Sequence, residues 1–280
     1  MVAIVVGNGP RVLIAGHGMV VCEEFMLAPG ITVTPAIPRL PDALIVHNNA
    51  DFKTTFGALA MERIANFSLA IDDAAGGKAL AVKAWNSLWT FSLLALACKS
   101  PVMSLYSAPE GSSQLSLANR NIVINPLPTI ASADIEKLQW AREHYEQFNV
   151  LVGDRRFQAA QRYYNNSHYL FDDDAKIMLL WAGIEGLLGV DSELRRRIAL
   201  HAAILHDGDA SAKAAHFTNV KKAYDIRSKV VHGTGADATS LKTAYAFASE
   251  VLVSLLRKMV ELGRVPPASE LDQLAVAASL

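Results

Sequence analysis

An arginine and a histidine, Arg227 and His232, lie five positions apart near the end of a predicted helix. Arginine presents several donors in one plane and suits a phosphate, while histidine as a residue type exchanges a proton near neutrality. Together the two residue types favour acid–base chemistry on a phosphoester. The same spacing also arises by chance, and a cation in the last turn simply suits the helix dipole.

The segment 217–232 has the periodicity of an amphipathic helix. One arc is apolar and holds Phe217, Val220, Ala223, Tyr224, Ile226, Val230 and Val231. Arg227 lies inside that arc, where an unpaired charge is costly. The opposite stripe holds Asp225, Ser228 and His232, beside Lys221 and Lys229. Gly233 is the expected stop of the helix, so His232 is predicted to be accessible.

A second charge lies inside an apolar arc. Glu185 falls between the angular positions of Met178 and Trp181 in the predicted helix 175–188. Because each would otherwise be an unpaired buried charge, we expect Glu185 and Arg227 to pair across the helices. The pair is either purely structural, or it holds the guanidinium in orientation towards a phosphate beside His232.

Three segments carry a family resemblance in the right order and spacing. They are 155–160, 176–189 and the stretch Tyr-Asp-Ile-Arg-Ser-Lys-Val-Val-His-Gly at 224–233. Together they resemble the HEPN superfamily, in its branch of Apea-like HEPN domains. The resemblance covers about residues 150–263 and says nothing of residues 1–125. It implies a helical bundle with a motif that often cleaves RNA without a metal.

The resemblance implies a metal-independent endoribonuclease, of the kind found in bacterial defence or stress response. Attack by the RNA 2′-hydroxyl would leave a 2′,3′-cyclic phosphate and a 5′-hydroxyl. The expected roles are catalytic for Arg227 and His232, supporting for Ser228, Glu185 and Asp225, and RNA-binding for Lys221, Lys222 and Lys229. No cofactor or metal is expected. Paired family domains share one cleft, so a homodimer through the helical domain is also expected.

Ser228 departs from the Asn, Asp or His that toxin-type members often carry after the arginine. The alternative function is therefore a non-catalytic HEPN module that binds RNA, nucleotide or a protein partner through the same residues.

The composition indicates a globular, cytoplasmic protein. The chain has 280 residues, 51% hydrophobic and 19% charged, with a formal net charge of −1, so an RNA site would have to be a local patch. Cys22 and Cys98 lie outside any metal-ligand spacing and are expected to be buried, reduced thiols. The N-terminus lacks the pattern of a signal peptide. The apolar run 79–98 is interrupted by polar residues and is predicted to be a buried core helix, not a membrane span.

The predicted fold is an α+β N-terminal part followed by an all-α antiparallel HEPN-like helical bundle. The predicted parts are an α+β domain of unknown role at 1–125, a Pro-rich linker at 126–131, the bundle at 132–263 and a tail at 264–280. Helices are expected at 155–168, 175–188, 193–206, 217–232 and 241–262, with a longer loop at 207–215 and one short helix in the tail. Near the N-terminus, Gly7-Asn8-Gly9-Pro10 between the Val- and Ile-rich runs 2–6 and 11–22 predicts a β-hairpin or a short meander.

Overall fold

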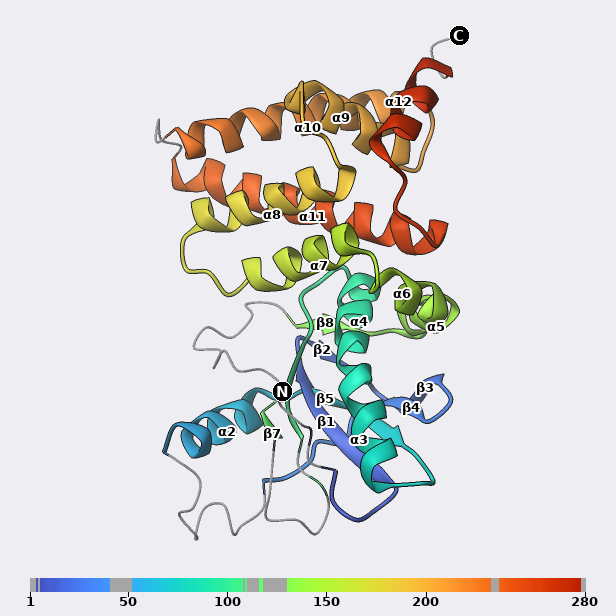
Figure 1. Cartoon of the computed structure of the whole chain (residues 1–280). Helices are drawn as coiled ribbons and strands as arrows, with labels where there is room; N and C mark the ends of the chain where they lie inside the picture. Colours follow the sequence, from blue (N-terminus) through green and yellow to red (C-terminus); the bar gives the residue numbers. More distant parts are fainter. Residues whose placement is uncertain are drawn as a thin grey trace. The chain divides into compact units, whose positions relative to one another are not determined.

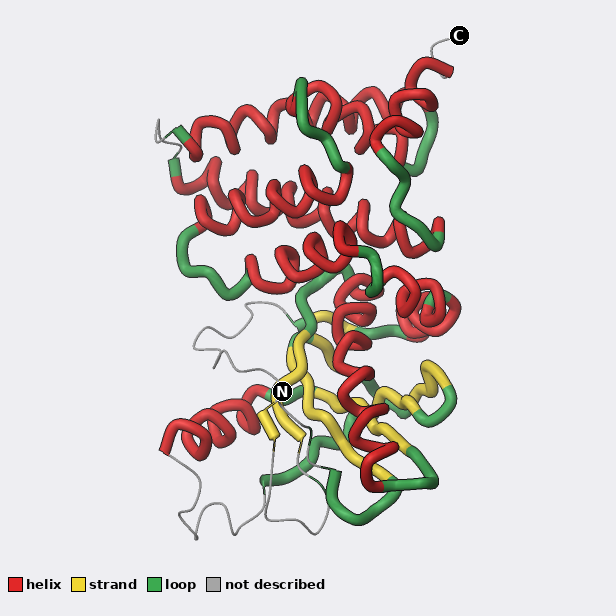
Figure 2. Tube along the Cα trace, viewed as in Figure 1, coloured by secondary structure: helices red, strands yellow, loops and turns green. Residues whose placement is uncertain are grey.

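The structure, a computed structural model, describes residues 4, 6–40, 52–107, 109, 116–117, 130–232 and 237–277. It divides the chain into two compact units, residues 1–145 and 146–280. The first unit combines an antiparallel sheet with helices, and the second is helical (Figures 1 and 2). The predicted order of an α+β part and then a helical part is confirmed. The units divide later than the linker predicted at 126–131, of which residues 126–129 lie outside the described residues.

The sheet of the first unit is antiparallel, with the strand order β3-β4-β5-β1-β6-β7. Its strands are β1 (Arg11–His17), β3 (Phe25–Ala28), β4 (Ile31–Thr34), β5 (Phe67–Asp72), β6 (Met103–Ser107) and β7 (Ser116–Leu117). A separate parallel pair joins β2 (Met19–Val20) to β8 (Ala131–Ser132). The hairpin or short meander predicted near the N-terminus involves residues 2–6, of which 2, 3 and 5 lie outside the described residues. Within the described residues β1 pairs with β5 and β6. Its apolar side chains are buried on both faces, as suits a central strand.

The apolar run near residue 90 folds as a continuous helical segment that includes one 3₁₀ turn. The helices of this unit are α2 (Phe52–Ile64), α3 (Gly77–Asn86), the short 3₁₀ helix η1 (Ser87–Trp89), α4 (Thr90–Cys98) and α5 (Ile135–Glu143). Every residue of α4 is buried, which confirms a core helix for that part, whereas α3 exposes Val82 and Trp85. Among the described residues, Gly77–Cys98 is one segment whose length and composition would suffice to cross a membrane.

The first unit contains one close approach at a glycine and one exposed cysteine. At Gly16 in β1, a Cβ would lie 2.5 Å from the Phe67 ring and 2.6 Å from the Phe91 ring, so only glycine allows both rings to close over the strand. Cys98 is buried, but Cys22 is exposed, which corrects the prediction that both thiols are buried.

The second unit follows the predicted helices closely. It contains α6 (Tyr145–Leu151), α7 (Arg155–Ser167), α8 (Asp173–Leu188), α9 (Leu194–Leu205), α10 (Ala210–Val231), α11 (Ala238–Leu262) and α12 (Ala268–Ala277). The loop predicted at 207–215 is wrong. Asp209 caps α10 by accepting a hydrogen bond from the Ala212 N–H, and the alanine-rich residues that follow extend the helix. Helix α10 is therefore long enough to run beside both α8 and α9.

Large apolar side chains fill the centre of the second unit. Trp181, Phe157 and Tyr164 are each at most 1% exposed, and α8 packs against both α7 and α11. A Cβ at Gly183 would lie 2.9 Å from the Leu252 side chain, so this glycine permits the close approach of α8 to α11. Helix α8 is thus the central helix of the unit, and Glu185 is one of its residues.

The C-terminal segment packs on the second unit. The Arg156 Nη2 donates to the carbonyl oxygens of Val265, at 3.0 Å, and Pro266, at 3.3 Å. Leu271 of α12 is 1% exposed, and α12 lies against α9. The short helix predicted for the tail is present, and it forms part of the packed unit.

Candidate functional site

The end of α10 presents the predicted site residues. Val220, Ala223 and Tyr224 are buried, but Val231 is 43% exposed, so the buried arc is narrower than predicted. The reason is that the last turn of α10 extends past the side chains that cover its middle. Arg227 has a side chain that is 24% exposed, at the boundary between the buried arc and solvent.

The predicted ion pair between α8 and α10 is confirmed. The Arg227 Nη2 donates to Glu185 Oε2 at 3.3 Å and lies 3.0 Å from Oε1, where the angles do not make a hydrogen bond. The side chain of Glu185 is only 19% exposed. A pair that is shielded to this degree costs more to break than an exposed surface pair, because removing one partner leaves a charge in a poorly solvated place.

Two aromatic side chains complete the surroundings of Arg227. Its guanidinium carbon lies 5.4 Å from the centre of the Tyr224 ring, within range for a cation–π contact. The Trp181 ring meets Tyr224 edge-on, with ring centres 5.3 Å apart and an angle of 88° between the planes. Burial, and then the charge of Glu185, raise the pKa of Tyr224 above its ordinary value. The arginine is thus held by a carboxylate and an aromatic face.

Some hydrogen-bonding capacity in this cluster is unused. Among the described residues, Trp181 Nε1, Glu185 Oε1 and Arg227 Nε are buried and have no hydrogen-bond partner. Such atoms are unusual in a folded protein and carry an energetic cost. Arg227 therefore meets any ligand through its terminal nitrogens, because Nε is enclosed.

His232 lies where the helix ends. It is the C-cap residue of α10, its backbone N–H donates to the Ser228 carbonyl at 3.1 Å, and its side chain is exposed. Gly233, the predicted stop, lies outside the described residues. An exposed imidazole at a helix end is open to a ligand from solvent.

Asp225, on the polar stripe of α10, pairs with α9, whereas Arg227 pairs with α8. Both carboxylate oxygens of Asp225 accept hydrogen bonds from Arg195 of α9, at 2.5 and 2.7 Å. Asp225, predicted to support the site, thus pairs with α9. The Lys221 ammonium lies 5.2 Å from the Phe217 ring centre, and Lys222 and Lys229 are exposed.

A second cluster with buried polar groups joins α7, α8 and α11. His168 hydrogen-bonds through Nδ1 to the Tyr245 hydroxyl, and the Lys176 ammonium lies 5.1 Å from the Tyr245 ring centre. Burial, and then the charge of Lys176, lower the pKa of His168 to about 4. The buried Tyr164 ring meets the His168 ring edge-on, with ring centres 4.9 Å apart. The cluster therefore belongs to the packing of the unit.

The low pKa of His168 predicts a pH dependence of stability. An unfolded histidine takes up a proton near pH 6.5, whereas folded His168 takes one up only near pH 4, so the unfolded state binds more protons between these values. The free energy of unfolding should fall as the pH falls through this window, by at most about 3 kcal/mol from this residue. Urea unfolding at pH 7, 6 and 5 should give a shallower slope for His168→Gln than for the parent. Part of the slope will remain, because burial also lowers the pKa of His216 to about 4. Equal slopes would contradict the prediction.

Residues that could hold a metal do not gather in the described part of the chain, where no group of three or more His, Cys, Asp or Glu is suitably placed.

Comparisons with known proteins add no further constraint, since no protein-family model, curated protein or solved structure matches the chain.

Proposed function

We propose that the second unit is an HEPN-type domain and that the protein is a metal-independent endoribonuclease. The observation that carries the proposal is the position of Arg227, which is held by Glu185 at 3.0 Å five residues before an exposed His232 at the helix end. An anchored guanidinium and an accessible imidazole, brought together at one cleft, suit cleavage of a phosphodiester that contains its own nucleophile.

Arg227 would stabilise the negative charge that builds on the phosphoryl oxygens. Glu185 and the Tyr224 ring fix its orientation, so little reorganisation is needed when the charge develops. Because the side chain is 24% exposed, its terminal nitrogens have a route to solvent and to a phosphate. Glu185 and Tyr224 act as positioning residues in this scheme, and they do not touch the substrate.

His232 would move the protons. The 2′-hydroxyl oxygen attacks the adjacent phosphorus while one imidazole takes the hydroxyl proton. The bond from phosphorus to the 5′-oxygen breaks, and a second imidazole gives a proton to that oxygen. The products are a 2′,3′-cyclic phosphate and a 5′-hydroxyl, so no water, metal or other reactant is consumed in this step.

A homodimer through the helical unit would supply both imidazoles. Five residues along a helix correspond to about 7.5 Å of rise and about 140° of rotation, so Arg227 and His232 do not lie side by side on one helix. A two-fold axis beside the two helix ends would bring two copies of each residue to one cleft. Lys222 and Lys229, which are exposed on the same helix, would then meet the RNA backbone.

Three observations favour a second function. Arg227 is already paired with Glu185, its Nε is enclosed, and Ser228 follows it, all of which suit a residue that serves packing. The second candidate is therefore a non-catalytic HEPN module that binds RNA, nucleotide or a protein partner.

Cleavage of RNA in the presence of EDTA separates the two functions. The purified parent protein is mixed with a pool of labelled RNA, and the ends of the products are analysed. Cyclic-phosphate ends made by the parent, and lost in Arg227→Ala, would support the nuclease. Glu185→Gln is the informative partner variant, because it keeps the shape of the side chain but loosens Arg227, and we expect a partial loss of rate. No cleavage by a folded, dimeric parent would favour the binding module.

A further inference from the structure

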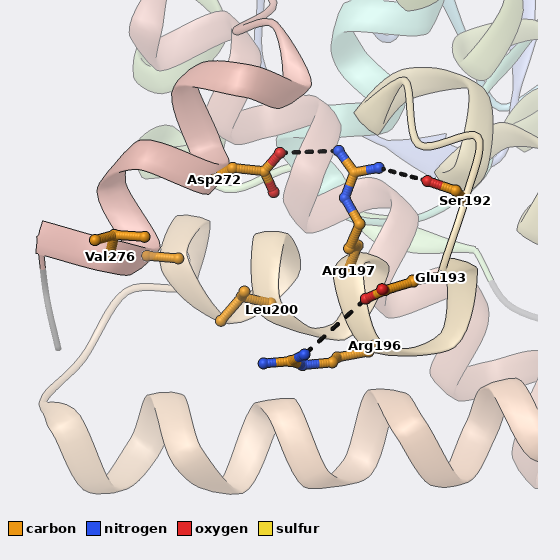
Figure 3. A pocket seen from close by; sticks show the side chains of 8 residues that line it. Ser192, Glu193, Arg196, Arg197, Leu200, Asp272 and Val276 are labelled. Carbon is orange, nitrogen blue, oxygen red and sulfur yellow. Dashed lines mark hydrogen bonds and ion pairs between the residues drawn. The ribbon is translucent and has the colours of Figure 1, made fainter.

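A separate pocket lies between the first turn of α9 and helix α12. Its volume is about 650 Å³. The lining side chains come from both helices and from the turn before α9 (Figure 3): Ser192, Glu193, Arg196, Arg197, Leu200, Asp272, Ala275 and Val276. A volume of this order is typical of sites for small organic molecules. None of these residues belongs to the cluster around Arg227.

One wall of the pocket is a fixed network of charges. Asp272 accepts from Arg197 Nη2 at 2.9 Å and lies 2.8 Å from His201 Nε2, and the His201 side chain is fully buried. These hydrogen bonds from His201 and Arg197 lower the pKa of Asp272. The carboxylate of Asp272 is therefore held by its own partners, and the charge of Arg197 offsets its negative charge. The network holds α12 in place as the far wall.

Arg196 is the group with capacity to spare. Its side chain is 75% exposed, and the ion pair that it forms within the described residues is with Glu193, at 4.0 Å. A contact of that length between two exposed side chains contributes little. A guanidinium carries five N–H donors in a plane that matches two oxygens of a phosphate. Arg196 can thus exchange a weak intrahelical contact for a strong bidentate one.

The remaining wall is apolar. Figure 3 shows Arg196 and Leu200 of α9 and Val276 of α12 bordering the same space, while Arg197 turns towards Asp272. Val276 is 65% exposed although it is a large aliphatic side chain. An apolar surface beside a cationic group favours a ligand that has both a flat or apolar body and an anionic group.

We propose that this pocket binds a small organic phosphate, with the phosphate on Arg196 and the body of the molecule against Leu200 and Val276. The function proposed for Arg227 and His232 is not needed for this inference, because the pocket and its lining residues are separate from that site.

Isothermal titration calorimetry of the full chain tests the proposal. The probes are adenosine monophosphate, adenosine and inorganic phosphate. We expect the monophosphate to bind at least about 10-fold more tightly than either fragment. We expect Arg196→Ala to weaken its binding by about 10-fold or more, since one charge-assisted bidentate contact is lost. Val276→Asp, which places a carboxylate at the apolar wall, should weaken binding to a similar degree.

Two controls keep the result specific. Arg162→Ala removes an exposed arginine of α7 and should leave binding unchanged. Arg227→Ala distinguishes this pocket from the proposed RNA site, because it removes only binding that depends on that site. Binding that is lost in Arg227→Ala but kept in Arg196→Ala would overturn the proposal. So would the absence of binding to the parent, or a monophosphate that binds no better than inorganic phosphate.

Discussion

Replacing His232 by alanine is expected to lower the rate of RNA cleavage by about 10²- to 10⁴-fold, the usual contribution of a positioned acid or base. The residue is exposed at the end of α10, and α10 is held by contacts that do not involve its side chain. The free energy of unfolding should therefore change by less than about 0.5 kcal/mol, as for other exposed positions. Rates under single-turnover conditions, with urea unfolding of the same preparations, measure the two effects separately.

The pH profile identifies the role of the imidazole more sharply than the rate alone. If one His232 accepts a proton and another donates one, cleavage by the parent should follow a bell-shaped curve. The residual rate of His232→Ala should lack both limbs of that curve. Lys222→Ala is the matched comparison, because it removes an exposed cation from the same helix and should weaken RNA binding without changing the shape of the profile. A loss of less than about threefold in His232→Ala, with an unchanged profile, would contradict a catalytic histidine.

Replacing Trp181 by alanine is expected to cost about 3–5 kcal/mol of folding free energy. The side chain is fully buried in α8, the helix on which α7 and α11 both pack, and it supports the Tyr224 ring. Trp181→Phe should cost much less, about 1–2 kcal/mol. Its indole N–H has no partner among the described residues, so no hydrogen bond is lost and only volume changes.

Chemical unfolding followed by far-ultraviolet circular dichroism measures both tryptophan variants, because the helical unit dominates that signal. Trp85→Ala provides the control, since Trp85 is 43% exposed in the other unit and should shift the helical transition by less than about 1 kcal/mol. Equal losses in Trp181→Ala and Trp181→Phe would show that the indole N–H matters more than the buried volume.

The helices of the second unit could be predicted from local sequence, because their signals are local. Asp154, Asp209 and Asp237 each cap the helix that follows by accepting a backbone N–H. The loop expected at 207–215 was wrong because Asp209 caps α10 and the residues that follow it are helical. The sheet is less accessible to prediction, because β1 has its partners β5 and β6 far along the chain and strand pairing of that kind has no local signal.

The ion pair of the candidate site could be predicted because two charges stood in apolar arcs, and burial leaves such charges few choices. The arrangement of Tyr224 and Trp181 could not, since an apolar position does not specify how a ring is turned. The pairs Arg195–Asp225 and Arg197–Asp272 were also missed. A run of arginines is as typical of a solvated helix face as of ion pairs between helices, and only the fold shows which carboxylates lie opposite.

The two ion pairs of α10 together fix the phase of the helix about its own axis. Asp225 forms an ion pair with α9, and Arg227 forms one with α8. The two residues are about 200° apart around the helix axis, so the ion pairs hold α10 from nearly opposite sides. His232 lies about one and a half turns further along the helix, so the rotation of the helix also sets the direction of its imidazole. One extra residue inserted between Arg227 and His232 would rotate the imidazole by about 100° around the helix axis, while both ion pairs would remain. The direction in which His232 points is therefore determined by the number of residues that separate it from the two ion pairs.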